Sequence, residues 1–238
     1  MECSLVKKRF SASRASRAQK ILQGMVMLED QPGEPSVIAG LDAAYTRRDG
    51  KSIGVGVAVA IDSGSLEVLS CKWYAAEVCV PYIPGLLAFR EMRIMAPPLS
   101  LLMEEVNVDM VVVDGHGIAH PRGFGIASHV GVAFRIPSIG VAKKRLYGEL
   151  RRIGGKTYLI DEGRPIGVYL QGVYVSPGHM VTVERAARMV EGLRVRGKLP
   201  EPTRVADIVT KRLRRRIPWL GPGDCSAEAR RTGLLDYI

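Results

Sequence analysis

The fold is decided by three strand-like runs: VIAGLDAAY (37–45), IGVGVAVAI (53–61) and LEVLSCKWY (66–74). The turn signals Arg48-Asp49-Gly50 and Asp62-Ser63-Gly64 separate them. Together they predict an antiparallel meander of three strands. The second run is apolar almost throughout, which is typical of a central strand that is covered on both faces.

Strand-like and helix-like segments alternate after this meander. Short buried strands are expected at 109–114 and 137–142, and a further strand at 165–175. Helices are expected over 13–29, 86–95, a stretch ending at 106, 125–135, 181–196 and 203–216. The fold class is therefore α/β, with a mixed central sheet in which parallel strands follow the meander and helices flank the faces.

Two of these helices carry specific expectations. In the helix over 13–29, Ile21, Leu22, Met25 and Leu28 share one face, which makes the segment amphipathic. Pro97-Pro98 is expected to interrupt the helix that begins at 86.

Length and composition bound the class of protein. The 238 residues predict a single domain over 1–238, with a tail at 217–238 of unassigned role. No apolar run reaches the roughly 20 residues of a membrane helix, and no secretory signal follows the start. A cytoplasmic protein without a membrane partner is therefore expected. The four cysteines show no C-x-x-C spacing and are expected to be buried free thiols.

The net charge of +10 favours a polyanionic partner. Each basic group that docks on a phosphate releases a counterion, so a basic chain suits a nucleic acid. Charge alone also fits a basic enzyme with no such partner.

Four acids occur where burial makes an unpaired charge costly. Asp42 lies inside an apolar run, Asp114 ends a buried strand, and Glu91 and Asp207 lie among apolar residues of expected helices. Carboxylates that converge in this way could hold Mg²⁺, which prefers oxygen ligands. Each acid taken alone also fits a cap or an ion pair; Glu91 has Arg90 and Arg93 nearby, and Asp207 has Arg204 and Lys211.

Other catalytic motifs are missing from the sequence. His116 and His120 have zinc spacing, but Gly115 and Gly117 disfavour a helix there and the H-E-x-x-H glutamate is absent. The chain has no P-loop and no G-x-S-x-G elbow. A zinc protease, a P-loop enzyme and a serine hydrolase are thus excluded.

Two further features suit a nucleic acid. Tyr82 lies between prolines in PYIP, where it could stack on a base, although it could equally anchor its loop to the core. Basic clusters occur at 143–145, 151–152 and 211–216. Lys143 directly follows a buried strand, so it could project into the same cleft as Asp114.

Six stretches of the chain resemble the endonuclease V family. They are IAGLDAAY (38–45), PYIPGLLAFRE (81–91), VVVDGHGIAHPRGFGIASHVG (111–131), PSIGVAKKRL (137–146), SPGHMVTVERA (176–186) and LPEPTRVAD (199–207). The first dozen residues and the tail at 217–238 match nothing in the family pattern.

The resemblance implies an RNase H-like fold and a nuclease that recognises deoxyinosine in DNA. It implies Mg²⁺ as cofactor, for which Mn²⁺ could substitute, and hydrolysis of the second phosphodiester bond 3′ to the lesion, leaving a 3′-hydroxyl and a 5′-phosphate. RNA containing inosine stays open as a further substrate. A monomer is expected.

The resemblance also assigns residues. Asp42, Glu91 and Asp114 match the metal-binding acids, Asp207 matches a fourth active-site position, and Lys143 matches the lysine near the scissile phosphate. The wedge that separates strands at the lesion corresponds to Pro81, Tyr82, Ile83 and Pro84. The pocket for the flipped base corresponds to Gly85, Leu87, Gly115, His120, Gly125 and Ile126.

Two other hypotheses remain at this point. One is an RNase H-like ribonuclease or resolvase with different substrate rules. The other is a nucleic-acid-binding protein that no longer cuts, although the presence of all four acids does not favour it.

Overall fold

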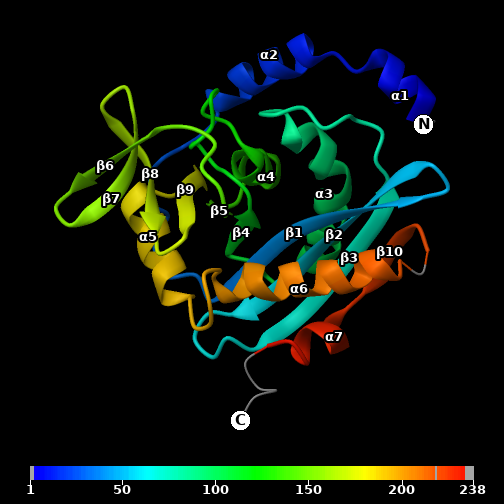
Figure 1. Cartoon of the computed structure of the whole chain (residues 1–238). Helices are drawn as coiled ribbons and strands as arrows, with labels where there is room; N and C mark the ends of the chain where they lie inside the picture. The colour runs from blue at the N-terminus through cyan, green and yellow to red at the C-terminus, as the bar shows by residue number, and fades with distance from the viewer. Residues whose placement is uncertain (1–2, 218, 234–238) are drawn as a thin grey trace.

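A computed structural model describes residues 3–217 and 219–233 of the chain (Figure 1). The strands are β1 (Val37–Arg48), β2 (Lys51–Asp62), β3 (Val68–Glu77), β4 (Met110–Asp114), β5 (Ser138–Ala142), β6 (Glu149–Ile153), β7 (Lys156–Asp161), β8 (Arg164–Leu170), β9 (Val173–His179) and β10 (Gly221–Asp224). Within the described ranges they form one sheet in the order β10-β3-β2-β1-β4-β5-β9-β8-β7-β6.

The predicted meander is confirmed. β1 pairs with β2, and β2 with β3, in antiparallel register. β4 then pairs with β1 in parallel, and β5 with β4, so the centre of the sheet is mixed as expected. Leu41 of β1 lies opposite Val113 of β4, which brings the residues after them to the same edge of the sheet.

Helices cover both faces of this sheet (Figure 1). The helices of the described residues are α1 (Cys3–Arg9), α2 (Ala12–Gln23), α3 (Leu87–Glu105), α4 (Ile126–Phe134), α5 (Val183–Gly192), α6 (Glu201–Arg215) and α7 (Ser226–Arg230). The faces are covered by α3 to α7, whereas α2 packs against α4. One buried cluster joins the sheet to α3 and α4, and the other joins it to α5, α6 and α7.

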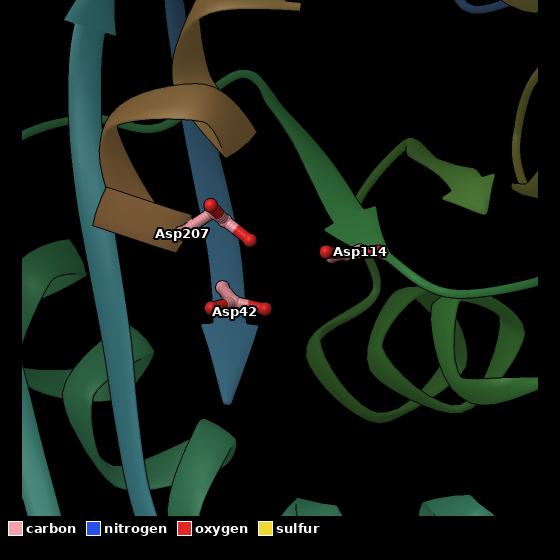
Figure 2. Close-up of side chains that lie close together, drawn as sticks. All are labelled: Asp42, Asp114 and Asp207. Atoms are coloured by element: carbon pink, nitrogen blue, oxygen red, sulfur yellow. The ribbon is translucent and has the colours of Figure 1, made fainter. Parts of the chain in front are cut away.

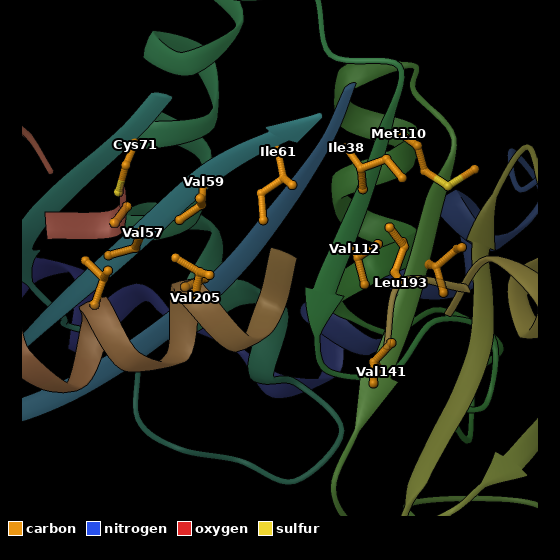
Figure 3. Packing of buried hydrophobic residues seen from close by; sticks show 14 of the residues in the cluster. Ile38, Val57, Val59, Ile61, Cys71, Met110, Val112, Val141, Leu193 and Val205 are labelled. Atoms are coloured by element: carbon orange, nitrogen blue, oxygen red, sulfur yellow. The ribbon is translucent and has the colours of Figure 1, made fainter. Parts of the chain in front are cut away.

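The two faces of β2 show how the sequence builds these layers. Val57 and Val59 point toward the α6 side (Figure 3), and Val55 belongs to the same buried cluster. Ala58 and Ala60 instead belong to the cluster on the α3 side. Small residues on the second face let α3 approach closely. A Cβ on Gly56 would lie only 2.0 Å from the carbonyl oxygen of Ile94 in α3. The expectation of a strand covered on both faces is thus confirmed.

The predicted break at Pro97-Pro98 is wrong, because α3 runs without interruption through both prolines. Proline removes a helical hydrogen bond and typically costs about 3 kcal/mol inside a helix. Met95, Leu99 and Leu102 lie buried on the same helix and pack against the sheet. This apolar burial opposes the cost, and tertiary packing here overrides local propensity.

The single strand predicted over 165–175 is also wrong. The chain reverses after β8, and Gln171 and Gly172 form a two-residue loop in which both residues have positive φ, +43° and +101°. That conformation is the one that joins antiparallel strands with matching twist. Two strands that were not expected from the sequence, β6 and β7, extend the sheet beyond β8.

The expected helix over 13–29 is shorter and differently oriented. α2 ends at Gln23, and Ile21 and Met25 are 69% and 55% exposed. The side that packs inward carries Ala15 and Gln19 instead. The apolar face of this segment is therefore not its buried face.

The described part of the tail joins the sheet. β10 pairs antiparallel with β3, and Ala229 of α7 is buried in the cluster below α6.

The expectation of free thiols is wrong, because Cys3 is bonded to Cys79 and Cys71 to Cys225. These partners are 76 and 154 residues apart, so local spacing carried no signal for them. Residues 218 and 234–238 of the predicted tail lie outside the described residues.

Candidate active site

Three aspartates meet at the carboxyl ends of the parallel strands (Figure 2). Asp42 on β1 and Asp114 at the end of β4 follow the paired residues Leu41 and Val113, and Asp207 extends toward them from α6. One carboxylate oxygen of each lies within 4.8 Å of the others. The crevice at the carboxyl ends of strands is the usual position of a site in an open α/β sheet.

A glycine on β1 permits this meeting. A Cβ on Gly40 would lie 2.1 Å from the carbonyl oxygen of Pro202, in the first turn of α6. Because Gly40 has no side chain, α6 lies directly against β1. Asp207 lies about one and a half turns after Pro202 along α6, which places its carboxylate close to that of Asp42.

Lys143 supplies the positive charge of the site. Its ammonium Nζ lies 2.7 Å from Asp114 Oδ2 and 2.8 Å from Asp207 Oδ1. Burial opposes the charge on Lys143, but the hydrogen bonds to Asp114 and Asp207 outweigh it and raise its pKa. Lys211 also pairs with Asp207, at 2.5 Å. Burial raises the pKa of Asp207, and its bonds to both lysines bring the net value below the ordinary one.

Asp42 is the most buried of the three aspartates. Burial, followed by the charge of Asp114, raises the pKa of Asp42 to about 7. The hydroxyl of Thr210 donates a hydrogen bond to Asp42 Oδ2 and opposes this shift. A buried carboxylate whose charge is disfavoured in this way gains most from a bound cation.

Glu91 approaches from α3, on the other face of the sheet. It is not part of the group of three, but the charges of Asp42 and Asp114 reach it. Burial is the main cause that raises its pKa to about 8. Its hydrogen bond comes from Tyr45 Oη, 3.1 Å from Oε1, and Arg90 stacks over the Tyr45 ring at 4.4 Å.

Of the neighbouring basic residues that could have paired with Glu91 and Asp207, all of which the structure describes, only one forms the ion pair. Lys211 does pair with Asp207, whereas Arg204 binds Glu201. Arg90 and Arg93 donate to the backbone carbonyl oxygens of Val80 and Glu77.

A cavity of about 210 Å³ opens beside the aspartates. All six residues predicted for the base pocket line it: Gly85, Leu87, Gly115, His120, Gly125 and Ile126. Tyr82 and Pro84 of the predicted wedge line it too, whereas Pro81 and Ile83 do not belong to its lining. The volume is below the roughly 300–1,000 Å³ of pockets for drug-sized ligands, so it suits a small ring system.

Backbone atoms shape much of the cavity wall. A Cβ on Gly125 would lie 2.2 Å from the carbonyl oxygen of His116, so only glycine fits there. His120 Nε2 lies 2.9 Å from the carbonyl oxygen of Gly85, and burial lowers the His120 pKa to about 4. The ring is therefore neutral at pH 7, with its proton on the nitrogen that faces the carbonyl. Gly115 follows Asp114 directly, so the cavity begins one residue from the carboxylates.

Tyr82 stands out from the surface with 68% of its area exposed. The alternative that this ring anchors its loop to the core is therefore wrong. An exposed aromatic beside a base-sized cavity is suited to stacking on a nucleic acid.

Sequence reasoning missed several residues of the site. Thr210 lies three residues after Asp207, so the helical spacing along α6 was an available signal for it. Tyr45 lies on the opposite face of β1 from Asp42, and no local spacing indicated its bond to Glu91. Lys144, Arg145 and Leu146 line the cavity next to Lys143.

Among the helices of residues 3–217 and 219–233, none combines the length and apolar character needed to cross a bilayer.

Known proteins resemble this chain over most of its length. The family profile described as Endonuclease V matches residues 20–208. Endonuclease V of Aeropyrum pernix is 51% identical over 210 residues, which are 86% of this chain and 81% of that protein.

Solved structures resemble it as well. Endonuclease V of Streptomyces avermitilis has a TM-score of 0.76 at 31% identity and covers 88% of this chain and 95% of its own. Endonuclease V of Ciona intestinalis, in complex with a 24mer DNA containing an inosine followed by a ribo-adenosine, has a TM-score of 0.72 at 22% identity, over 86% of this chain and 98% of its own. At that identity the Ciona structure supports the fold alone. The expected RNase H-like fold is confirmed, and the chain belongs to the endonuclease V family of nucleases.

Proposed function

We propose that this protein cuts DNA at deoxyinosine and hydrolyses the second phosphodiester bond on the 3′ side of the lesion, leaving a 3′-hydroxyl and a 5′-phosphate. The observation that carries the proposal is the adjacency of Asp114 and Gly115. The first belongs to the group of three carboxylates and the second to the wall of the cavity. Base recognition and strand cleavage therefore share one short segment.

The carboxylates fit a divalent cation such as Mg²⁺. Asp42, Asp114 and Asp207 offer only oxygen donors, which hard cations prefer, and a cationic group, the Lys143 ammonium, already lies between two of them. Glu91 adds a fourth carboxylate, itself buried, within electrostatic reach. Mg²⁺ held here would supply Lewis acidity and neutralise negative charge at the phosphate. We propose Mn²⁺ as a substitute of the same ligand preference.

The chain's own residues then divide the work. Asp42, Asp114 and Asp207 hold and orient the cation, with Glu91 beside them. Lys143, whose raised pKa keeps it charged, would place its ammonium against the phosphate that is cut. None of these roles requires a nucleophilic side chain, because water is the attacking group in a hydrolysis.

The cavity and the wedge explain selectivity for the lesion. Inosine pairs more weakly than an ordinary base and is easier to extrude. Tyr82, exposed between Pro81 and Ile83, would stack in the gap that the base leaves. The cavity walls formed by Gly85, Gly115 and Gly125 would receive the flipped base against backbone groups.

RNA that contains inosine is a further proposed substrate. The Ciona relative was solved with a nucleic acid in which a ribonucleotide follows the inosine. A ribose at that position is thus compatible with a protein of this fold.

The proposal is tested with matched oligonucleotides that carry one inosine or one adenine, as DNA and as RNA, with Mg²⁺ or with EDTA. End-labelled products should map one nick, at the second bond 3′ to inosine, only with Mg²⁺. Asp114→Asn should remove the nick. A nick only in inosine RNA would move the substrate to RNA, and a nick that ignores inosine would contradict the proposal.

A further inference from the structure

We propose that α1 and α2 brace the segment 79–85, which carries the wedge, at both of its ends. In this proposal, Cys3 and Gln19 are positioning residues that set how well the protein opens a duplex at the lesion. The inference rests on the proposed function, because it concerns how that function reaches a base that is still paired.

The first contact of the brace is a buried glutamine on α2. Gln19 is only 1% exposed. Its Nε2 donates to the carbonyl oxygens of Gly85, at 3.0 Å, and Phe124, at 3.1 Å. Its Oε1 accepts from Arg122 Nε at 2.6 Å. Burial of an amide is costly unless it is hydrogen-bonded, and here both ends of the amide are used.

These bonds converge on one peptide group. The carbonyl oxygen of Gly85 accepts from Gln19 Nε2, from His120 Nε2 and from Arg122 Nη2. Gly85 has a φ of +76°, a conformation that favours glycine. It comes directly after Pro84, so the end of the wedge is fixed in position against α2 and the cavity wall.

The second contact is covalent. Cys79 lies two residues before Pro81 and is bonded to Cys3 of α1, with the two Cα atoms 4.9 Å apart. Arg90 of α3 also donates to the carbonyl oxygen of Val80, at 2.5 Å. The start of the segment is therefore tied to α1, just as its end is tied to α2.

The segment between the two contacts is short and stiff. Pro81 and Pro84 each have a fixed φ, and Tyr82 between them faces solvent. A wedge must push against base pairs, and an unbraced loop would yield instead. The orientation of α2 agrees with this role, since the helix buries Gln19 and leaves Ile21 exposed.

The test compares the cleavage of inosine in a duplex with that of the same inosine in a single strand, under single-turnover conditions. An unpaired inosine needs no strand separation. Gln19→Leu, which keeps the volume and removes the bonds, should lower the duplex rate by about 10-fold. Gln19 also lines the cavity, so the fall in the single-strand rate measures any loss in base binding, and the duplex rate should fall by more than that. Cys3→Ser should also lower the ratio of duplex rate to single-strand rate, because it frees the start of the wedge segment. Its single-strand rate should stay near wild type, because Cys79 and Val80 lie outside the cavity lining.

Matched controls separate this effect from a general loss of stability. Gln23→Leu changes an exposed glutamine at the end of the same helix, and Cys225→Ser opens the other disulfide. Both should keep the wild-type ratio of duplex to single-strand rates. Gln19→Glu should resemble Gln19→Leu, since a carboxylate can accept from Arg122 but cannot donate to Gly85.

Outcomes distinguish the brace from the function on which it rests. If the wild-type protein does not nick inosine in either substrate, the proposed function is wrong. If the wild type nicks both, an unchanged ratio in Gln19→Leu or in Cys3→Ser overturns the brace. A lowered ratio in both, with thermal melting and thiol titration as checks on folding and disulfide state, supports it.

Discussion

The hydroxyl of Thr210 on α6 donates a hydrogen bond to Asp42 Oδ2 on β1, 168 residues earlier in the chain. The hydroxyl oxygen of Thr210 also lies 2.6 Å from the carbonyl oxygen of Ala206 and 3.2 Å from that of Asp207. Thr210 is fully buried, so this bond fixes the rotamer of a carboxylate that has little contact with water. Groups that orient metal-binding carboxylates in this way tune the affinity for the metal.

We therefore predict that Thr210→Val weakens metal binding. Valine keeps the shape of threonine and removes the hydroxyl, and the loss of such an outer contact typically costs roughly 10- to 100-fold in metal affinity. The Mg²⁺ concentration for half-maximal nicking should rise by that factor. Thr210→Ser should stay near wild type because it keeps the donor, and equal metal dependence in the two variants would contradict the role.

Asp42→Asn should abolish Mg²⁺-dependent nicking and leave the fold intact. Asparagine removes a buried charge that the protein tolerates poorly without a cation, so the metal-free variant should melt at the wild-type temperature or above it. Mg²⁺ should raise the melting temperature of the wild type and not of the variant. Asp49→Asn, in the β1–β2 turn where asparagine also adopts positive φ, is the matched control.

The buried carboxyls of Asp42 and Glu91 should make the metal-free wild type lose stability, relative to a variant that lacks both carboxyls, as the pH rises from 5 to 8. The pKa values of Asp42 and Glu91 are raised to about 7 and about 8 in the folded state. Between their unfolded and folded pKa values the native state binds more protons at these two carboxyls, so their contribution to the free energy of unfolding falls with rising pH. Urea melts in EDTA across this range measure the slope.

The control for this pH dependence is the double variant Asp42→Asn, Glu91→Gln. It lacks both carboxyls but keeps the buried histidines whose pKa values are lowered, so its free energy of unfolding should increase relative to that of the wild type as the pH rises. Equal slopes would mean that the two carboxyls do not titrate in this window.

Tyr82→Ala should weaken binding to a duplex that contains inosine more than binding to an undamaged duplex. Stacking of an aromatic ring on a base contributes ~1–3 kcal/mol, so a loss of about 10-fold in affinity is expected. Tyr82→Phe keeps the stacking face and should bind as the wild type does. Fluorescence anisotropy with both duplexes in EDTA measures the difference, and equal losses on the two duplexes would argue against a wedge.

Much of the central fold could be predicted from local pattern. Strand-like runs and the turn residues between them located β1, β2 and β3, and short apolar runs located β4 and β5, because a doubly covered strand has to be apolar. The four acids and Lys143 were identifiable since a charge within an apolar segment is costly and needs a partner. The motifs from PYIP to PTRVAD were enough to indicate the family.

Tertiary structure decided what depends on distant partners. Pro97 and Pro98 stay inside α3 because the sheet packs against that helix, and α2 buries Gln19 because Gly85 and Arg122 meet it there. The disulfides join cysteines 76 and 154 residues apart. Contacts of Thr210 with Asp42 and of Tyr45 with Glu91 likewise exist only once α6 and α3 lie on opposite faces of β1. Local sequence sets propensity and burial, whereas the pairing of polar groups is fixed only when the whole chain has packed.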